Sequence, residues 1–307
     1  MKIGNLDITN PKIGTTSINK VYMGNNKVWE RFSFLLDGLT GSTAAFSLRK
    51  LKSSYTGNAV QVRRSSDNTT QDIGFVNNQL DVTSLNTFCS GTNGFVSIWY
   101  NQSDASNNLV QATSTNQPKI YDSVNGVELQ NGKPALSFNN GEHMTVNNNS
   151  FASLSTLKNI VVVNKPTSDA LMMLIGKGYF STGEWTFYTL NAYSNGLKYR
   201  FGLDASLYYD NINPPTILNV YSLYFASFVN GLNGFNSYNN GQLYLQDDIT
   251  TNFSGSTTYN LTLGMSSRYP GQYYFTGTMQ EVLLFSSDQT ANKTTIENNI
   301  NTNYTIY

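Results

Sequence analysis

Residues 159–165 read NIVVVNK, a short β-branched run between polar residues, and segments of this kind decide the fold. Clusters of Asn, Gly and Ser separate them, and these residues favour turns because Asn and Gly tolerate left-handed backbone. Short strands at such spacing predict an all-β sandwich. The further runs are AVQVRR at 59–64, GFVSIWY at 94–100, PALSF at 134–138, ALMMLIG at 170–176, WTFYTL at 185–190, YSLYFASFV at 221–229, LTLGM at 261–265 and EVLLF at 281–285.

The composition favours one large folded domain with a small appendage. The 307 residues include 20 Tyr, 17 Phe and 3 Trp, which supply broad apolar faces for a core. The 19 basic residues are balanced by 19 acidic ones, so we expect no nucleic-acid partner. No apolar stretch is long enough to cross a bilayer, so we expect no membrane insertion. The start, MKIGNLDITN, also lacks the apolar run of a secretory signal.

Few residues suit a metal or a cofactor. Cys89 is the single cysteine, which excludes an intrachain disulfide. His143 is the single histidine, which excludes a His-rich metal site and leaves any His-based triad to this one residue. Asp247 and Asp248 could contribute to a calcium site, because Ca²⁺ binds carboxylate and carbonyl oxygens, but the Asp-x-Asn-x-Asp spacing is missing. The sequence therefore predicts no cofactor, with calcium as the one alternative.

Three segments interrupt the strand pattern and predict short helices. Residues 43–53 carry apolar side chains at near-helical spacing with basic residues between them. Residues 81–89 open on Asp81, which suits an N-cap, and residues 288–303 predict a closing helix after Asp288. The apolar positions are Ala44, Phe46, Leu48, Leu51 and Tyr55 for the first segment, and Ala291, Ile296, Ile300 and Tyr304 for the last.

The beginning of the chain has a repeat of its own. KIGNLDI at 2–8 recurs as KIGTTSI at 12–18. In KVYMGNNKVW at 20–29, the turn-forming residues 24–26 separate two apolar flanks, which is the pattern of a hairpin. The sequence therefore predicts a small β unit ahead of the main domain.

We expect two parts: a β-hairpin attachment module at 1–32 and a main β domain at 38–307. The module needs a partner surface, either the main domain or another protein, because isolated hairpins are marginal in water. Its apolar side chains exceed what a ribbon of this size can bury in itself. They are Ile3, Ile8, Ile13, Ile18, Val21, Tyr22, Val28 and Trp29.

Two blocks carry a resemblance to a known family. SLRKLKSSYTGNAVQVRRSSDNTTQDIGF at 47–75 and FCSGTNGFVSIWYNQSDASNNLVQAT at 88–113 resemble the catalytic domain of the α-L-arabinofuranosidase B family. The resemblance covers about 44–307, most strongly to 140, and implies a concanavalin-like jelly roll. The matching residues are Tyr55, Gly57, Arg64, Ser66-Asp67, Asp72-Ile73-Gly74, Phe88-Cys89, Tyr100-Asn101-Gln102-Ser103 and Asn108-Leu109-Val110-Gln111-Ala112.

The resemblance implies a degenerate catalytic pair. A retaining glycosidase needs two carboxyls about 5 Å apart, one as nucleophile and one as acid/base. The nearest counterpart of the family's nucleophile is Glu184. The family's acid/base Asp follows a Leu-Gly-x-Gly-Gly strand end, and LGMSSRYPG at 263–271 has Arg268 there. An arginine stays protonated and cannot act as a general acid at neutral pH, so we expect no enzyme activity.

The family's cysteines are also lost. Its adjacent cysteine pair corresponds to Leu171-Met172, and the partner of its first cysteine corresponds to Gly94, which leaves Cys89 unpaired. Other carboxylates could replace the missing acid, although most are expected to be loop or capping residues. They are Asp72, Asp122, Glu142, Asp204, Asp210, Asp247, Asp248 and Glu281.

Sugar binding is the hypothesis that remains. Saccharides stack their apolar ring faces on aromatic side chains while amides and carboxylates meet the hydroxyls, and this chain is rich in both kinds of residue. The alternative is that the tyrosines are ordinary strand residues. The candidates are Tyr208, Tyr209, Asp210, Asn211, Tyr269, Tyr273 and Tyr274, beside Arg268.

The pairing of an N-terminal module with this block resembles virion proteins of tailed bacteriophages. It implies a head fibre, tail fibre or capsid decoration protein, located in the virion and assembled in the host bacterial cytoplasm. Residues 1–32 would contact other virion proteins, the jelly roll would bind a host-surface glycan, and a fibre would be a homotrimer. Two alternatives stay open: an active glycoside hydrolase, disfavoured by Arg268, and a bacterial surface lectin, disfavoured by the missing signal.

Overall fold

The computed structural model describes most of the main domain and parts of the N-terminal region. From residue 34 onward it describes the chain except for residues 140 and 154 and five segments. Among residues 1–33 it describes the backbone of six short strands. No helix of the described part is both long and apolar enough to cross a membrane. The five segments outside the description are 179–184, 192–196, 204–206, 211–215 and 251–257.

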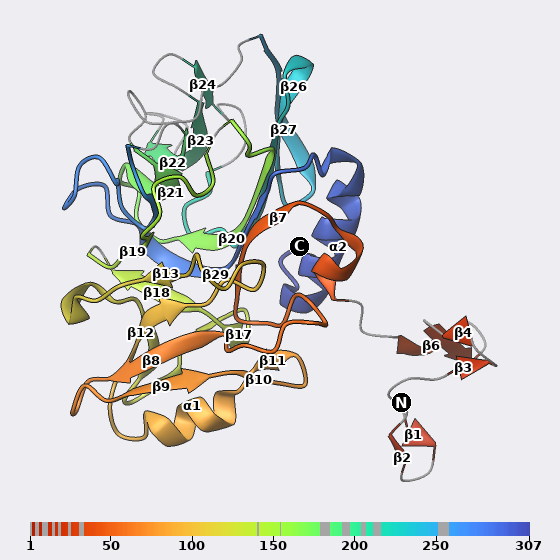
Figure 1. Cartoon of the computed structure of the whole chain (residues 1–307), viewed down its shortest axis with the longest axis vertical. Coiled ribbons are helices and arrows are strands. Elements are labelled where there is room, and N and C mark those ends of the chain that lie inside the picture. Colours follow the sequence, from red (N-terminus) through yellow and green to blue (C-terminus); the bar gives the residue numbers. More distant parts are fainter. Residues whose placement is uncertain are drawn as a thin grey trace.

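The six N-terminal strands pair two by two (Figure 1). The hairpin predicted for 20–29 is confirmed, although Asn26, expected in the turn, opens the second strand opposite Met23. Each pair is a sheet of its own, and none of the six strands joins the large sheet. The pairs are β1 (Lys2–Ile3) with β2 (Leu6–Asp7), β3 (Lys12–Ile13) with β4 (Thr16–Ser17), and β5 (Lys20–Met23) with β6 (Asn26–Glu30).

The main domain is the all-β sandwich that the sequence predicts, with its strands linked in one large antiparallel sheet. Its central layer is built around β20 (Asn159–Pro166), which lies between β25 (Ser222–Phe228) and β29 (Thr276–Phe285). The layer continues from β25 through β26 (Gly231–Asn239) to β27 (Gln242–Ile249), and β29 pairs on its other edge with β7 (Ser42–Ser47) and β18 (Leu136–Asn139).

The second layer runs from β9 to β24 across the sandwich (Figure 1). Its strands, in order of pairing, are β9 (Thr70–Ile73), β8 (Val60–Arg64), β12 (Gly94–Trp99), β13 (Leu109–Val110), β19 (Met144–Val146), β28 (Leu261–Leu263), β21 (Met172–Lys177), β22 (Trp185–Asn191), β23 (Leu197–Leu203) and β24 (Leu207–Asp210). Smaller elements are η1 (Leu35–Gly38), β10 (Phe75–Val76), β11 (Gln79–Leu80), η2 (Ser114–Asn116), β14 (Lys119–Asp122), β15 (Gly126–Val127), β16 (Leu129–Gln130), β17 (Lys133–Pro134) and η4 (Thr290–Asn292).

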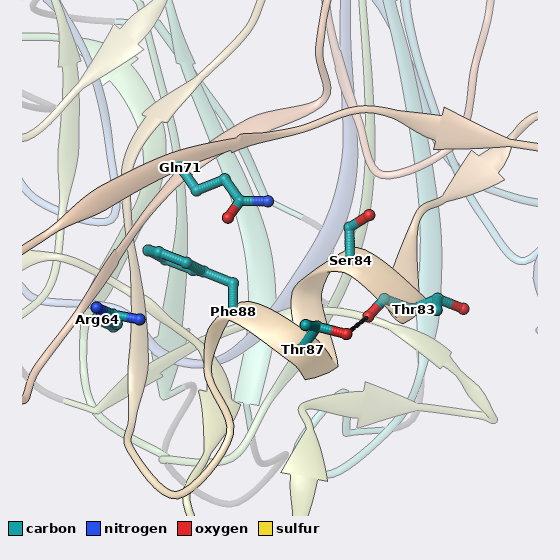
Figure 2. A pocket seen from close by; sticks show the side chains of 6 residues that line it. All are labelled: Arg64, Gln71, Thr83, Ser84, Thr87 and Phe88. Carbon is teal, nitrogen blue, oxygen red and sulfur yellow. Dashed lines mark hydrogen bonds between the residues drawn. The ribbon is translucent and has the colours of Figure 1, made fainter.

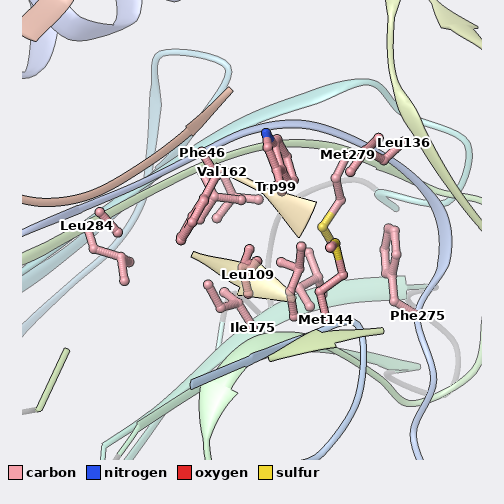
Figure 3. Packing of buried hydrophobic residues seen from close by; sticks show 14 of the residues in the cluster. Phe46, Trp99, Leu109, Leu136, Met144, Val162, Ile175, Phe275, Met279 and Leu284 are labelled. Atoms are coloured by element: carbon pink, nitrogen blue, oxygen red, sulfur yellow. The ribbon is translucent and has the colours of Figure 1, made fainter. Parts of the chain in front are cut away.

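The central strands β20 and β29 are buried on both faces, which explains the continuous apolar runs NIVVVNK and EVLLF. Side chains alternate along a strand. In β20, Val162 therefore packs toward the second layer, while Val161 and Val163 pack toward the C-terminal helix. Figure 3 shows the inner cluster, where Val162 and Leu284 meet residues of both layers. Its labelled members are Phe46, Trp99, Leu109, Leu136, Met144, Val162, Ile175, Phe275, Met279 and Leu284.

The helix predicted for 43–53 is wrong, because this segment forms β7 and an extended tail. Ala44, Ala45 and Phe46 alternate between the two hydrophobic clusters, as strand residues do. β7 pairs with β29, where Phe46 lies opposite Val282. Pairing with a fully buried strand outweighs a helical spacing that depended on the more distant Leu51 and Tyr55.

The other two predicted helices are confirmed. α1 (Val82–Phe88) begins after Asp81, whose carboxylate accepts a hydrogen bond from the Ser84 backbone N–H at 3.0 Å. α2 (Lys293–Tyr304) packs its Ile296, Ile300 and Tyr304 side chains against the central layer. Ala291, expected on that apolar face, instead lies exposed in the short turn η4.

A buried ion pair joins three distant parts of the chain. The Arg49 guanidinium donates to both carboxylate oxygens of Glu281 in β29, at 2.8 and 3.0 Å. Ser47 Oγ and Tyr304 Oη donate to the same carboxylate, at 2.8 and 3.1 Å. Burial alone would lower the pKa of Arg49, but the charge and hydrogen bond of Glu281, together with the Tyr304 hydroxyl, more than offset this, so its pKa is raised. Glu281 is therefore a structural carboxylate and not a spare acid for catalysis.

We expect Glu281→Gln to lower the free energy of unfolding by about 3–5 kcal/mol, because it leaves the Arg49 charge buried without a counter-charge. Urea unfolding followed by circular dichroism would measure the change. Asp67→Asn is the matched control, since Asp67 pairs with Arg64 at the surface, where solvent screens the interaction. Equal effects of the two substitutions would show that burial of the Glu281 pair has no energetic consequence.

Candidate functional site

The residues next to positions 184 and 268 lie beside the C-terminal end of β21 in the second layer. Lys177, the last residue of β21, lies in register with Trp185, the first residue of β22. The next residue, Gly178, donates its N–H to Ser267 Oγ at 2.6 Å. Its carbonyl accepts from Ser266 Oγ at 3.1 Å. Glu184 itself lies outside the described residues, but the residue that follows it and the residue that precedes Arg268 both adjoin the end of β21.

A loop covering residues 265–274, here called the 265–274 loop, connects β28 to β29 and is hydrogen-bonded to β21. Gly264 starts it with a φ of +84°, a conformation that favours glycine, and a Cβ there would lie 3.0 Å from the Glu142 carbonyl. The Gly264 N–H donates to Leu174 O at 2.8 Å, and the Met173 N–H donates to Tyr273 O at 2.8 Å. With Ser266 and Ser267 bound at Gly178, the loop is attached to both ends of β21.

Arg268 is a half-buried cation near the tip of this loop. Its guanidinium carbon lies 5.2 Å from the centre of the Tyr269 ring. No hydrogen bond or ion pair forms at Arg268 within the described part of the chain. All four other described arginines have such partners: Arg49 with Glu281, Arg63 with Gln117, Arg64 with Asp67, and Arg200 with Tyr188.

The 265–274 loop carries three tyrosines, and one of them, Tyr274, packs near His143. The Tyr274 ring lies 6.0 Å from the His143 ring, and the Tyr269 N–H donates to Ser266 Oγ at 3.3 Å. His143 Nδ1 lies 3.1 Å from the Gly141 carbonyl, so backbone contacts set the position of this ring. Tyr269, Tyr273 and Tyr274 are all half-buried. Three of the predicted sugar-binding tyrosines therefore belong to this one loop.

Lys177 was missed by the sequence analysis. It is fully buried, and its Nζ donates to the Asn149 carbonyl at 2.7 Å. The neighbouring Trp185 Nε1 donates to the Ala152 carbonyl at 2.9 Å. The signal available in the sequence was a lysine that ends the otherwise apolar strand MMLIGK. Segment 149–152 therefore closes the sandwich beside the strand ends that carry the site.

The other predicted sugar-binding group lies elsewhere on the same layer. Tyr208, Tyr209 and Asp210 belong to β24, and Asn211 falls outside the described residues. In backbone register, Asp210 lies opposite Arg200. β22 and β23 separate β24 from β21, which corresponds to three strand spacings, or roughly 14 Å. No described contact joins the two groups of tyrosines.

The remaining carboxylates considered as substitutes have structural partners. Asp72 accepts from Tyr100 Oη at 2.8 Å, and Glu142 accepts from the Asn139 N–H at 2.6 Å. Asp122 pairs with Lys119 at 2.8 Å, and this contact, with two backbone N–H groups, lowers the pKa of Asp122 to about 2. These contacts explain the three residues as capping and bridging groups.

The predicted calcium ligands have local partners as well. Asp247 accepts from the Asp248 N–H at 2.8 Å, and Asp248 accepts from the Asn233 N–H at 2.7 Å. Within the described ranges, no group of three or more His, Cys, Asp or Glu residues lies close enough to hold a metal ion. Asp204, the last of the alternatives, is not among the described residues.

A pocket of about 370 Å³ lies between α1 and the β8–β9 strands, away from both tyrosine groups (Figure 2). The Arg64 guanidinium lies 5.1 Å from the Phe88 ring centre and is already paired with Asp67. Thr87 Oγ1 donates to the Thr83 carbonyl at 3.0 Å. The side chains of Arg64 and Thr87 therefore already have partners within the protein. Its lining consists of Arg64, Gln71, Thr83, Ser84, Thr87 and Phe88.

Comparison with known families supports the expected resemblance. A family model described as "Alpha-L-arabinofuranosidase B, catalytic" matches residues 35–154. This region contains both blocks that carry the resemblance in the sequence, and it ends before positions 184 and 268. A search of curated proteins found no match.

Solved structures extend the likeness over most of the chain. A mutant GH54 α-L-arabinofuranosidase soaked with 4-nitrophenyl α-L-arabinofuranoside has 19% identity and a TM-score of 0.64. An arabinofuranosidase complexed with arabinofuranosyl-α-1,2-xylobiose has 20% identity and a TM-score of 0.61. Each alignment covers 84% of this chain and 62% of the other. The chain therefore has an arabinofuranosidase-like fold and spans about 62% of the length of these enzymes.

Gly94 and Cys89 are direct neighbours in the sandwich. Cys89 is free and buried. A Cβ added at Gly94 would lie 2.6 Å from the Cys89 Sγ atom, so the two positions are close enough to be cross-linked after a small adjustment. This agrees with the expectation that Gly94 stands where the family has the cysteine partner. Burial also raises the pKa of the Cys89 thiol to about 11, which keeps it protonated at neutral pH.

We expect Gly94→Cys to form a disulfide with Cys89 under oxidising conditions. Closing so short a loop would raise the free energy of unfolding by about 2 kcal/mol relative to the reduced variant. Thiol titration of the unfolded protein and urea unfolding with and without reductant would measure both effects. Gly94→Ala is the control, because its methyl group meets the same sulfur without a bond and should destabilise the protein. Two free thiols after oxidation would contradict the expected pairing.

Proposed function

We propose that this chain is a carbohydrate-binding virion protein, a head fibre, tail fibre or decoration protein, that uses an arabinofuranosidase-like jelly roll for adhesion and not for hydrolysis. One observation carries the proposal: Arg268, at the position that the resemblance assigns to the acid/base, has no carboxylate partner among the described residues. A guanidinium cannot donate a proton to a leaving group at neutral pH.

Binding remains chemically reasonable at the same place. The 265–274 loop is attached at both ends of β21, so its tyrosines are held before a ligand arrives. Preorganised aromatic side chains bind sugar rings at low entropic cost. Tyr269, Tyr273 and Tyr274 provide such surfaces, while the serines that fix the loop direct their hydroxyls to Gly178.

The virion role rests on the N-terminal module. Its three strand pairs form separate two-stranded sheets, and such sheets need an additional surface for stability. We propose that other virion proteins supply this surface for residues 1–32 and that the jelly roll faces the host glycan. A homotrimer would multiply weak glycan contacts through avidity.

The active hydrolase is the competing function, because the fold is that of arabinofuranosidases. We expect no release of nitrophenol from 4-nitrophenyl α-L-arabinofuranoside, since the two-carboxyl arrangement is lost at Arg268. A colorimetric assay at neutral pH would measure this. Release above the uncatalysed rate that Glu184→Gln abolishes, while Asp169→Asn does not, would reverse the proposal in favour of the enzyme.

We expect deletion of residues 1–32 to leave a soluble, folded domain, because strands β1–β6 form no pairs with the large sheet. The midpoint of thermal unfolding should stay unchanged, and any homotrimer formed by the full chain should be lost. Circular dichroism and light scattering after size exclusion would measure these properties. Aggregation or unfolding of the truncated protein would show that the module covers the main core and would contradict its role in attachment.

A further inference from the structure

We infer that the 265–274 loop binds a sugar that carries an anionic group, a carboxylate or a sulfate, and that Arg268 is its anchor. The inference rests on the proposed glycan binding and adds the chemical class of the glycan. It is carried by the partial burial of Arg268, by its having no hydrogen-bond or ion-pair partner among the described residues, and by the way in which the loop holds it.

The first argument concerns charge. A half-buried guanidinium loses part of its hydration, and proteins normally offset that loss with a hydrogen-bonded partner. The four other described arginines follow this rule, and Arg268 does not. A carboxylate or sulfate fits the vacant donors well, because the planar guanidinium can donate two parallel hydrogen bonds to two oxygens of one anion.

The second argument concerns geometry. The Arg268 guanidinium lies over the Tyr269 ring, 5.2 Å from its centre, and the Tyr269 N–H is bound to Ser266 Oγ. Ser266 in turn binds Gly178 at the end of β21. The guanidinium therefore contacts the ring of a residue whose backbone is hydrogen-bonded, through Ser266, to the end of β21. This fixed position lowers the entropy cost of binding an anion.

The third argument concerns the aromatic rings of the loop that carries the cation, of which Tyr269 contacts Arg268. The ring of Tyr274, at the end of the 265–274 loop, lies 6.0 Å from the ring of His143. An acidic sugar presents an apolar ring face together with a charged substituent, which calls for an aromatic surface next to a cation. A neutral sugar would use the aromatic surface and leave the Arg268 charge unmatched.

The test uses three matched oligosaccharides on the full chain: galactotriose, trigalacturonate and a sulfated galactotriose. Isothermal titration calorimetry should show at least one of the anionic ligands binding roughly tenfold more tightly than galactotriose, with the difference shrinking at high salt. The comparison of trigalacturonate with the sulfated ligand identifies which anion the site prefers.

Variants separate a charge contact from a general effect on the loop. Arg268→Gln should reduce the affinity for the anionic ligand to that for galactotriose, and Arg268→Lys should restore part of it. Arg63→Gln is the matched control, because Arg63 is also half-buried over an aromatic ring, Phe95, but is already hydrogen-bonded. It should leave the affinities unchanged, and thermal unfolding would verify that each variant is folded.

Three outcomes count against the inference, and they are distinguishable. Equal affinity for neutral and anionic ligands would overturn the anionic specificity and leave glycan binding intact. An equal loss of affinity for both ligand types in Arg268→Gln would assign Arg268 to hydroxyl contacts instead. No binding of any of the three ligands or of a wider glycan panel would overturn the proposed function itself, and the inference with it.

Discussion

The buried contact between Arg49 and Glu281 is the constraint on which the rest of the structure depends. Removing two charges from water is costly, and only complete pairing compensates for it. Here the carboxylate receives donors from Arg49, Ser47 and Tyr304, which belong to the segment after β7, to β7 itself and to α2. These partners are compatible only when β7 lies in register with β29 and α2 covers the central layer. The pair therefore selects one arrangement of three elements that are far apart in the sequence.

The central layer in turn determines where a site can form. Because β20 and β29 are buried on both faces, their side chains are committed to packing. Ligand chemistry is left to the strand ends and loops of the second layer, where Gly178, Ser266 and Ser267 attach the 265–274 loop. A fold shared with arabinofuranosidases does not carry their activity, since function resides in the groups placed at such ends. Our proposal for Arg268 is of this kind: the resemblance implies that it stands where those enzymes have a proton donor, and we infer that it binds an anion.

Several elements could be predicted from local pattern because local forces decide them. The apolar runs became β20, β21, β25 and β29, and the Asp81 carboxylate caps α1 through its own neighbour Ser84. The segment at 43–53 could not be predicted in this way. Its apolar residues suit a helix or a strand, and the unpaired edge of β29, more than two hundred residues away, decided in favour of the strand. The role of Glu281 was hidden for the same reason, since its partners are distant in sequence.

The sequence by itself determined the sandwich class, the small N-terminal hairpin at 20–29 and the free Cys89. Only the tertiary structure decided that Gly94 faces the Cys89 sulfur, that Lys177 is buried at the end of β21, and that the Arg268 guanidinium lies over the Tyr269 ring while two strands separate β24 from β21. The physical reason is range. Hydrophobic periodicity and capping act over a few residues, so they can be recognised in the sequence. The register of paired strands is set by the burial of both faces of a sheet at once, and this register determines which distant side chains meet.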